Sequence, residues 1–293
     1  MAPSFKQAIF RLLTLIAVLC SSVAAGHAFA PKEAVTARIV VSSTTELEAA
    51  VRHANSKGGY VTIELHDGLY LLSQTLVVEA PHIALVSRSG RPADVVIAGD
   101  AMNSKARIGN LIRVAGSDFT LRGITLERSG RHLIQIAGEN DVDRSTIQDC
   151  IFRDSFEQLL KISWDSTKPE KRADDGRIEN CLFEYSAGIG PQYYIGGIDA
   201  HGARRWTVRG NVFRNIASPS RSVAEFAIHF WAGSEDNLVE KNAIIDCDRG
   251  IGFGLDNKPN RRGIIRNNII YHNANHHSFA DVGIALIESP GTI

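Results

Sequence analysis

A strand-like repeat that recurs six times between residues 119 and 273 is the feature that most constrains the fold of this chain. The repeated segments are FTLRGITLERS, STIQDCIFRDS, GRIENCLFEYS, WTVRGNVFRNI, NLVEKNAIIDC and GIIRNNIIYHN. Their third residues follow one another at spacings of 26 to 31 residues: Leu121, Ile147, Ile178, Val208, Val239 and Ile265. Because the segments are rich in β-branched residues and lack helical periodicity, the repeat predicts stacked β-strands.

Equivalent positions of the repeats hold similar side chains. The columns contain phenylalanine, asparagine and cysteine: Phe152, Phe183 and Phe213; Asn211, Asn242 and Asn268; Cys150 and Cys181. Such matching is expected when coils stack at the strand spacing of about 4.8 Å, because each side chain then lies on its equivalent. We expect the phenylalanines to lie in the core and the two cysteines to be buried thiols, with a disulfide as the alternative.

The repeat and its columns resemble the right-handed parallel β-helix of the pectin-lyase-like superfamily, over roughly residues 40 to 293. The resemblance implies an all-β fold, a single-stranded right-handed parallel β-helix or solenoid. It also implies a short helix that caps the N-terminal end. It implies little about activity, because many functions share this coil.

The stretch TTELEAAVRHANSKGG predicts that capping helix. Thr45 and Glu48 have the spacing of a capping box, and Gly58 is placed to end the helix. The apolar stripe consists of Leu47, Ala50, Val51 and Ala54. At the other end, the chain stops at ALIESPGTI, where a further coil would begin. We expect this C-terminal coil to be uncapped, with the chain truncated there or a partner covering the edge.

Residues 1–30 have the pattern of a secretory signal peptide, with basic residues, a short apolar run and a small-residue stretch. We expect cleavage between about residues 24 and 30 and a β-helix domain over residues 31–293. The protein is then periplasmic or secreted. The apolar run is too short to span a membrane, and no later segment is apolar enough, so no membrane insertion is expected.

A second strand lies between the repeats, in the segments HLIQIAG, EQLLKIS, GGIDAHG, FAIHFWA, RGIGFGL and VGIALIE. Strand alternation places Lys161, Asp199 and His229 outward in one column, and His201 and Trp231 outward in the next. Long loops beside this face carry further polar and aromatic residues: Tyr193, Tyr194, Arg221, His276 and His277. An ionisable groove with an aromatic rim suits an acidic polysaccharide. The 32 basic and 32 acidic residues cancel, which argues against a nucleic-acid partner.

We interpret this face as the site of a polysaccharide lyase that cleaves a uronate-containing chain by β-elimination. The enzyme must neutralise the uronate carboxylate and place a base on the neighbouring carbon. The candidate bases are Lys161, His201, His229 or a loop tyrosine. The candidate cations are Arg221 and Arg249, and Glu157, Asp199 and Glu225 are candidate Ca²⁺ ligands. Tyr193, Tyr194, Arg221 and Trp231 are the candidate substrate-binding residues.

The stretch from Glu157 to Lys161, followed by DAHG, is similar in layout to the chondroitinase-B and alginate-lyase branch. That resemblance implies Ca²⁺ and a lysine base. The alternatives are hydrolysis by two carboxylates, such as Asp199 and Glu225, epimerisation of uronates, and glycan binding without catalysis. Asp199 and His201 also fit a simpler interpretation as solvated surface groups.

Overall fold

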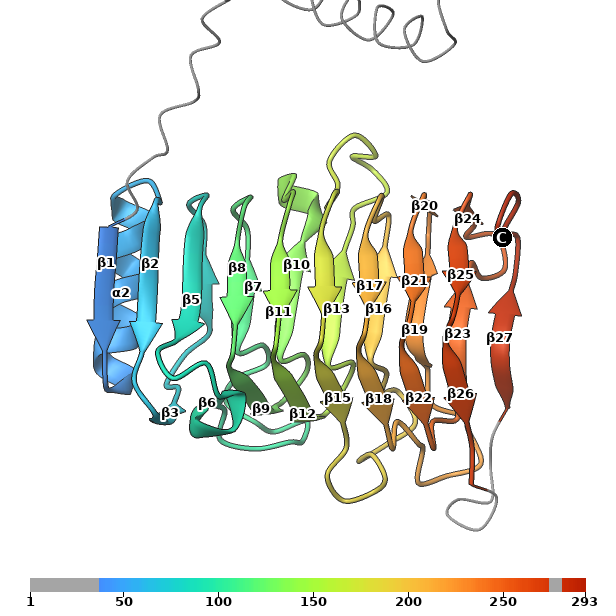
Figure 1. Cartoon of the computed structure of the whole chain (residues 1–293), viewed down its shortest axis with the longest axis horizontal. Helices are drawn as coiled ribbons and strands as arrows, with labels where there is room; N and C mark the ends of the chain where they lie inside the picture. The colour runs from blue at the N-terminus through green and yellow to red at the C-terminus, as the bar shows by residue number, and fades with distance from the viewer. Residues whose placement is uncertain (1–36, 274–280) are drawn as a thin grey trace, which may run out of the picture. The chain divides into compact units, whose positions relative to one another are not determined.

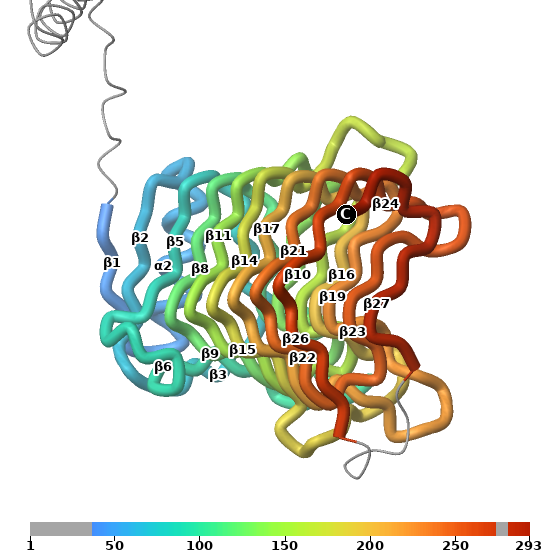
Figure 2. The backbone as a smooth tube through the Cα atoms, turned by 45° about the vertical axis from the view of Figure 1, so that its right-hand side comes forward, coloured from blue at the N-terminus to red at the C-terminus, as the bar shows by residue number. Residues whose placement is uncertain are grey.

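The structure is a computed structural model that describes residues 37–273 and 281–293. Residues from Thr36 to Ile293 form one compact unit. Three parallel sheets run along this unit, and the chain visits them in turn to form the coils of a β-helix (Figures 1 and 2). The predicted signal peptide and the loop histidines, His276 and His277, lie outside the described residues. No helix in the described part of the chain is long and apolar enough to cross a bilayer.

The strands of the three sheets are short, and each sheet takes one strand from a coil. The first sheet contains β1 (Ala37–Val41), β2 (Val61–Leu65), β5 (Ile83–Ser87), β8 (Thr120–Arg122), β11 (Thr146–Gln148), β14 (Arg177–Glu179), β17 (Thr207–Arg209), β21 (Leu238–Glu240) and β25 (Ile264–Arg266). The second sheet contains β4 (Leu76–Val78), β7 (Ile112–Val114), β10 (Ile134–Ala137), β13 (Leu160–Ser163), β16 (Ile198–His201), β19 (Phe226–Trp231), β23 (Arg249–Phe253) and β27 (Val282–Leu286). The third sheet contains β3 (Gly68–Leu71), β6 (Val95–Ala98), β9 (Thr125–Ser129), β12 (Ile151–Ser155), β15 (Leu182–Glu184), β18 (Val212–Arg214), β22 (Ala243–Ile245) and β26 (Ile269–Tyr271).

Five further elements of the described residues lie outside these sheets. The strands β20 (Ser234–Glu235) and β24 (Asn260–Arg261) pair with each other, and two 3₁₀ turns, η1 (Pro92–Asp94) and η2 (Gly138–Asn140), lie in the connections. The helix α2 (Thr44–Ser56) lies against the first coils (Figure 1).

The register predicted from the repeats is confirmed. Ile147 pairs with Leu121 and Ile178, and the column continues through Val208 and Val239 to Ile265. In the second sheet, Ile134, Leu160, Ile198, Ile228, Ile251 and Ile284 are paired in the same way. Parallel pairing thus stacks like on like, and the inward residues of the coils before the last one join one continuous core.

Stacked side chains hold the coils in this register. The rings of Phe152, Phe183 and Phe213 stack at centroid distances of 4.7 Å and interplanar angles of 6° and 8°. Asn211 Nδ2 donates to Asn242 Oδ1, and Asn242 Nδ2 donates to Asn268 Oδ1, both at 3.0 Å. These buried amides satisfy one another and the carbonyls at the bend, as the asparagine column predicts. Cys150 and Cys181 are buried free thiols, so the alternative of a disulfide is wrong.

The capping helix is confirmed, but the capping box predicted at Thr45 and Glu48 is wrong. Ser43 is the N-cap residue and accepts from the backbone N–H of Glu46 at 3.2 Å. Glu46 accepts from the backbone N–H of Ser42 at 2.7 Å. Glu48 instead accepts from the hydroxyl of Ser73 on a neighbouring loop at 2.8 Å. The sequence offers two overlapping Ser/Thr-x-x-Glu spacings, at Ser43 and at Thr45, and only the point where the chain leaves β1 selects between them.

Successive coils carry opposite charges in three outward columns. One column alternates Asp118, Arg144, Asp175, Arg205, Asp236 and Arg262, all with φ between 52° and 59°. The second column is Glu179, Arg209, Glu240 and Arg266, and the third is Glu127, Arg153, Glu184 and Arg214. Bidentate pairs such as Arg144 with Asp118, at 2.7 Å for both bonds, join neighbouring coils. An acidic coil therefore lies next to a basic coil along much of the solenoid.

The last coil exposes apolar side chains. Ile284 and Leu286 are 47% and 53% exposed, whereas their equivalents in the preceding coil, Ile251 and Phe253, are buried. The exposed apolar edge matches the expectation from the sequence.

Candidate functional site

The candidate site lies on the outer face of the second sheet, where β13, β16 and β19 are adjacent. Lys161 pairs in register with Asp199, and Asp199 pairs with His229. His201 pairs with Trp231 in the next outward position. The alternation seen in the sequence therefore places these five side chains on one face of three neighbouring strands, as expected.

Asp199 is the centre of the cluster. Lys161 Nζ contacts Asp199 Oδ2 in a charged hydrogen bond. Trp231 Nε1 donates to Asp199 Oδ1 at 2.6 Å, and His201 Nε2 lies 3.3 Å from the same oxygen. Both carboxylate oxygens are thus engaged, although the residue is only 5% exposed. A buried carboxylate requires such partners, because desolvation is otherwise very costly.

The charges around Asp199 determine its protonation. Burial by itself raises the pKa of the Asp199 carboxyl, but the hydrogen bond from His201 and the charge of Lys161 outweigh burial and hold the pKa well below its usual range. Asp199 is therefore ionised at neutral pH. The ionised carboxylate is the counter-charge of the Lys161 side chain in this nearly buried position.

Lys161 and His201 are in direct contact. Lys161 Nζ lies 2.8 Å from His201 Nε2. An ammonium only donates hydrogen bonds, so Nε2 accepts from Lys161 when the ring proton of His201 is on Nδ1, and it can donate to Asp199 Oδ1 when Nε2 carries the proton. Asp199 and His201 occupy two of the three ammonium donors, and the third is left for another acceptor. The side chains of Lys161 and His201 are 12% and 23% exposed, so both are reachable from the groove.

His229 is placed differently from the prediction of an accessible base. It points outward but is only 2% exposed, because Trp231 stacks on it at 5.2 Å and Phe226 packs at 4.7 Å. Its Nε2 donates to the carbonyl of Gly254 at 3.2 Å. Burial lowers the pKa of His229 to about 4, so the ring is neutral at pH 7. His229 therefore supports Trp231 and does not reach a substrate.

A cavity of about 470 Å³ opens beside the cluster. Its lining includes His201, Trp164, Ser166, Lys258 and Pro259. The Arg172 guanidinium stacks on Trp164 with a centroid distance of 4.9 Å, and Lys258 Nζ lies 4.7 Å from the centroid of Trp231. A concave site of this size with aromatic walls and a few polar groups suits one or two sugar units.

Trp164 and Lys258 are site residues that the sequence did not indicate. Trp164 directly follows β13 and Lys258 lies in the turn before β24, in loops of different coils. Their meeting depends on how these loops fold back over the second sheet. A tryptophan directly after an outward strand position was the one available signal.

The remaining predicted residues lie on the next strand, β23, and in the loops before β16 and β19. Arg249 is paired with Asp281 at 2.7 Å and packs on Phe226, so its charge is already partnered. Tyr193 and Tyr194 are 54% and 43% exposed in the loop before β16, and Arg221 is exposed in the loop before β19. Burial, with Asp199 as the next cause, raises the pKa of Tyr194, so this phenol keeps its proton.

The three carboxylates proposed as calcium ligands do not form a fitting site. Across residues 37–273 and 281–293, no group of three or more His, Cys, Asp or Glu side chains is arranged to hold a metal ion. Asp199 is saturated by nitrogen donors, while Glu157 and Glu225 face His132 at 3.7 Å and His229 at 4.0 Å. Calcium needs six to eight oxygen ligands, which this set does not offer.

The comparisons with known proteins agree with the fold. A family model described as "right handed beta helix region" matches residues 165–292. An alginate lyase from Paenibacillus sp. str. FPU-7 has a TM-score of 0.51 at 13% identity, over 87% of this chain and 99% of its own. A mannuronic acid specific polysaccharide family 6 lyase from human gut microbiota has a TM-score of 0.50 at 14% identity, over 86% of this chain and 63% of its own.

A surface adhesin of Streptococcus pneumoniae, PfbA, has a TM-score of 0.51 at 13% identity, over 85% of this chain and 77% of its own. A comparison with curated proteins finds no match. The chain thus has the right-handed parallel β-helix fold. At these identities the similarity establishes the fold alone, so the activity has to be argued from the site.

Proposed function

We propose that this protein is an exported polysaccharide lyase that cleaves a uronate-containing chain by β-elimination. The observation that carries the proposal is the contact of Lys161, Asp199 and His201 at the edge of an aromatic-walled cavity. Export is proposed from the signal-peptide pattern of residues 1–30.

Lys161 is proposed to neutralise the uronate carboxylate. Its third N–H is available, and its ion pair with Asp199 holds the side chain at the edge of the groove. Neutralising the carboxylate makes the proton on the adjacent carbon more acidic, because negative charge accumulates there in the transition state. This role replaces the neutralising arginine considered from the sequence, since Arg249 is already paired with Asp281.

His201 is proposed to be the base. When Lys161 turns toward a substrate carboxylate, its hydrogen bond to His201 Nε2 is released and that nitrogen can accept the proton. Asp199 Oδ1, at 3.3 Å, then stabilises the imidazolium. The electron pair of the broken C–H bond forms the double bond, and the bond to the glycosidic oxygen breaks. Tyr194, whose phenol is kept protonated, is proposed to protonate that leaving oxygen.

The test is the ultraviolet absorbance of unsaturated uronate, with alginate, pectate, chondroitin, heparan and hyaluronan as substrates. We expect a rise on one polymer, a loss of at least about 100-fold in kcat for His201→Gln, and a similar loss for Lys161→Gln. His53→Gln and Lys241→Gln alter exposed residues elsewhere and serve as matched controls. A chelator should leave the rate unchanged, because Lys161 is the neutralising cation.

Other outcomes point to other functions. If new reducing ends appear without absorbance, the protein is a hydrolase. If the protein binds a polymer without changing it, the protein is a glycan-binding β-helix. Turnover that survives both substitutions together would refute the proposed site.

A further inference from the structure

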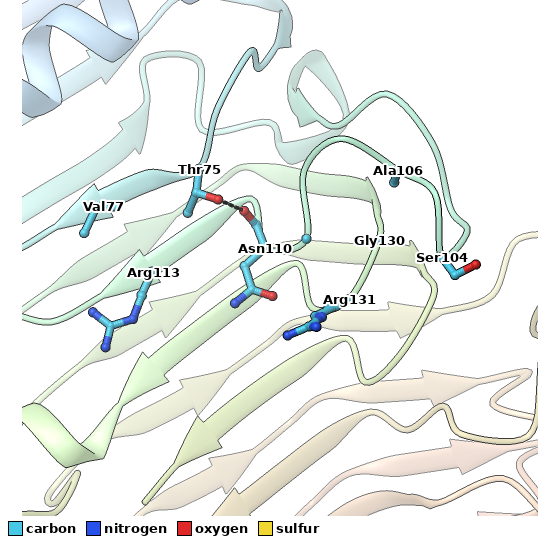
Figure 3. Close-up of a pocket in the computed structure, with 9 residues that line it drawn as sticks. Thr75, Val77, Ser104, Ala106, Asn110, Arg113, Gly130 and Arg131 are labelled. Carbon is cyan, nitrogen blue, oxygen red and sulfur yellow. Dashed lines mark hydrogen bonds between the residues drawn. The ribbon is translucent and has the colours of Figure 1, made fainter.

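A second cavity, of about 530 Å³, lies on the same outer face nearer the N-terminal end (Figure 3). Its polar lining includes Arg113, Arg131, Asn110, Ser104 and Thr75 (Figure 3). None of its nine lining residues is acidic, and because Arg113 is paired with Glu139 beside the cavity, the positive charge comes mainly from Arg131. A hollow of this size with two arginines and no carboxylate in its wall is suited to an anionic group.

Arg131 is the exposed cation of this cavity. Its guanidinium forms no salt bridge within the described residues, but its charge acts on the nearby Glu157 carboxyl, where it opposes the rise in pKa that burial causes. The backbone holds it in place: Arg131 N donates to Gly109 O at 2.8 Å, and Glu157 N donates to Arg131 O at 3.0 Å. Most other arginines on the solenoid are paired with a carboxylate of a neighbouring coil, so an arginine without a salt bridge over a hollow is an exception.

Arg113 is held more rigidly. Its Nη2 donates to Glu139 Oε1 at 3.0 Å and to Asn140 Oδ1 at 3.2 Å. Its Nε and Nη1 groups remain available as donors. Asn110 lies between the two arginines in the view of Figure 3, and its amide is fixed by Gln135 Oε1 at 2.7 Å. The cavity therefore offers preorganised donors and does not depend on a loop that must close.

The register connects this cavity with the candidate site. Arg113 pairs with Gln135, and Gln135 pairs with Lys161. Arg113 and Lys161 thus occupy the same outward column two coils apart, which corresponds to about 10 Å at the strand spacing. Gln135 Nε2 donates to Ser163 Oγ at 3.0 Å, so the surface between them is polar and continuous. A polysaccharide running along the column would present its charged groups to both places.

We infer that the Arg113–Arg131 cavity is a binding subsite for a carboxylate or sulfate group of an acidic polysaccharide, about two coils from the reacting sugar. The inference rests on the proposed function, because that function places the reacting sugar at Lys161 and so gives the subsite its position along the polysaccharide. The binding itself does not depend on any chemical step. Carboxylate and sulfate share the chemistry that two guanidinium groups recognise, so the choice between them is left to the experiment.

The experiment measures retention and Kd on polygalacturonate, alginate, chondroitin sulfate and carrageenan, with dextran as the neutral polymer. Arg131→Ala should weaken binding of the preferred acidic polymer about 10- to 50-fold, because each charge-assisted contact contributes a factor of this order. Arg131→Lys should restore part of the affinity. Arg177→Ala, which removes an exposed and unpaired arginine on the first sheet, should leave Kd unchanged. Preference for carboxylated or for sulfated polymers identifies the anionic group.

The outcomes separate this inference from the proposed function. Unchanged Kd for Arg131→Ala, or retention of none of the acidic polymers by the wild-type protein, overturns the subsite. Binding that Arg131→Ala weakens, with no turnover by the wild-type protein, supports the subsite and overturns the lyase. Turnover by the wild-type protein, together with an unchanged Kd for Arg131→Ala, supports the lyase and overturns the subsite.

Discussion

Trp231 donates its indole N–H to Asp199 Oδ1 at 2.6 Å, which ties the ring that Lys258 of the cavity wall packs on to the carboxylate at the centre of the cluster. The two residues lie on adjacent strands; Asp199 is buried and Trp231 is partly buried. His229 stacks behind the indole and fixes its plane. The aromatic surface and the charged groups are therefore one unit, and disturbing one part should disturb the other.

Removing the charge of Asp199 should destabilise the protein. Asp199→Asn leaves the Lys161 ammonium without its counter-charge in a nearly buried position, and we expect a loss of about 3 to 5 kcal/mol in the free energy of unfolding. Urea denaturation measures it. Asp236→Asn breaks an exposed pair with Arg262 and should cost less than about 1 kcal/mol. Equal losses of unfolding free energy in Asp199→Asn and Asp236→Asn would contradict the conclusion that Asp199 is the counter-charge of a nearly buried Lys161.

Stability should depend on pH through buried histidines. Burial lowers the pKa of His229 to about 4, whereas in the unfolded chain it is about 6.5. Between these values the unfolded state binds the extra proton, so this contribution is complete above about pH 6.5 and is lost as the pH falls toward 4. Between pH 4 and 6.5, His229→Gln should reduce the slope of the unfolding free energy plotted against pH by up to about 1.4 kcal/mol per pH unit. Parallel curves for the two proteins would show that His229 is not buried and neutral.

The asparagine ladder should be strongest at its centre. Asn242 is 2% exposed, donates to Val208 O and Asn268 Oδ1, and accepts from Asn211. Asn242→Ala leaves several buried groups unsatisfied and should cost about 2 to 4 kcal/mol. Asn268→Ala, at the half-exposed end of the ladder, should cost less because water replaces the lost partner. Thermal or urea unfolding of the two variants tests this order.

Trp164 should contribute to substrate binding more than to chemistry. Trp164→Ala removes an aromatic wall of the cavity, and we expect KM to rise about 5- to 10-fold with kcat little changed. Trp164→Phe should retain most of the affinity. Steady-state kinetics on the polymer that responds in the absorbance assay separates the two parameters. A fall in kcat alone would place Trp164 among the positioning residues instead.

The fold could be predicted from the sequence because each sequence repeat corresponds to one coil of the β-helix. Once Leu121, Ile147 and Ile178 are aligned, parallel pairing and strand alternation determine which residues point inward and which share a column. Lys161, Asp199 and His201 were found together for the same reason. The capping box at Ser43 was not found, because overlapping spacings in the sequence are equally good.

Burial on the outer face could not be predicted from alternation. Pointing outward does not make a residue accessible, and His229 is covered by Trp231 and Phe226. Alternation also says nothing of the loops, so Trp164 and Lys258 were missed and Arg249 was not recognised as the partner of Asp281. Loop conformation depends on many weak contacts that carry no periodic signal in one sequence.

The alternation of acidic and basic coils limits how such a solenoid can change its length. Duplicating the coil that carries Asp175, Glu179 and Glu184 would place like charges against each other in all three columns. Deleting the coil that carries Arg205 and Arg209 would bring Asp175 against Asp236 and Glu179 against Glu240. Duplicating these two coils together would preserve the alternation. The unit that can be gained or lost without a clash of charge is therefore the pair of coils, although the strands themselves repeat with every single one.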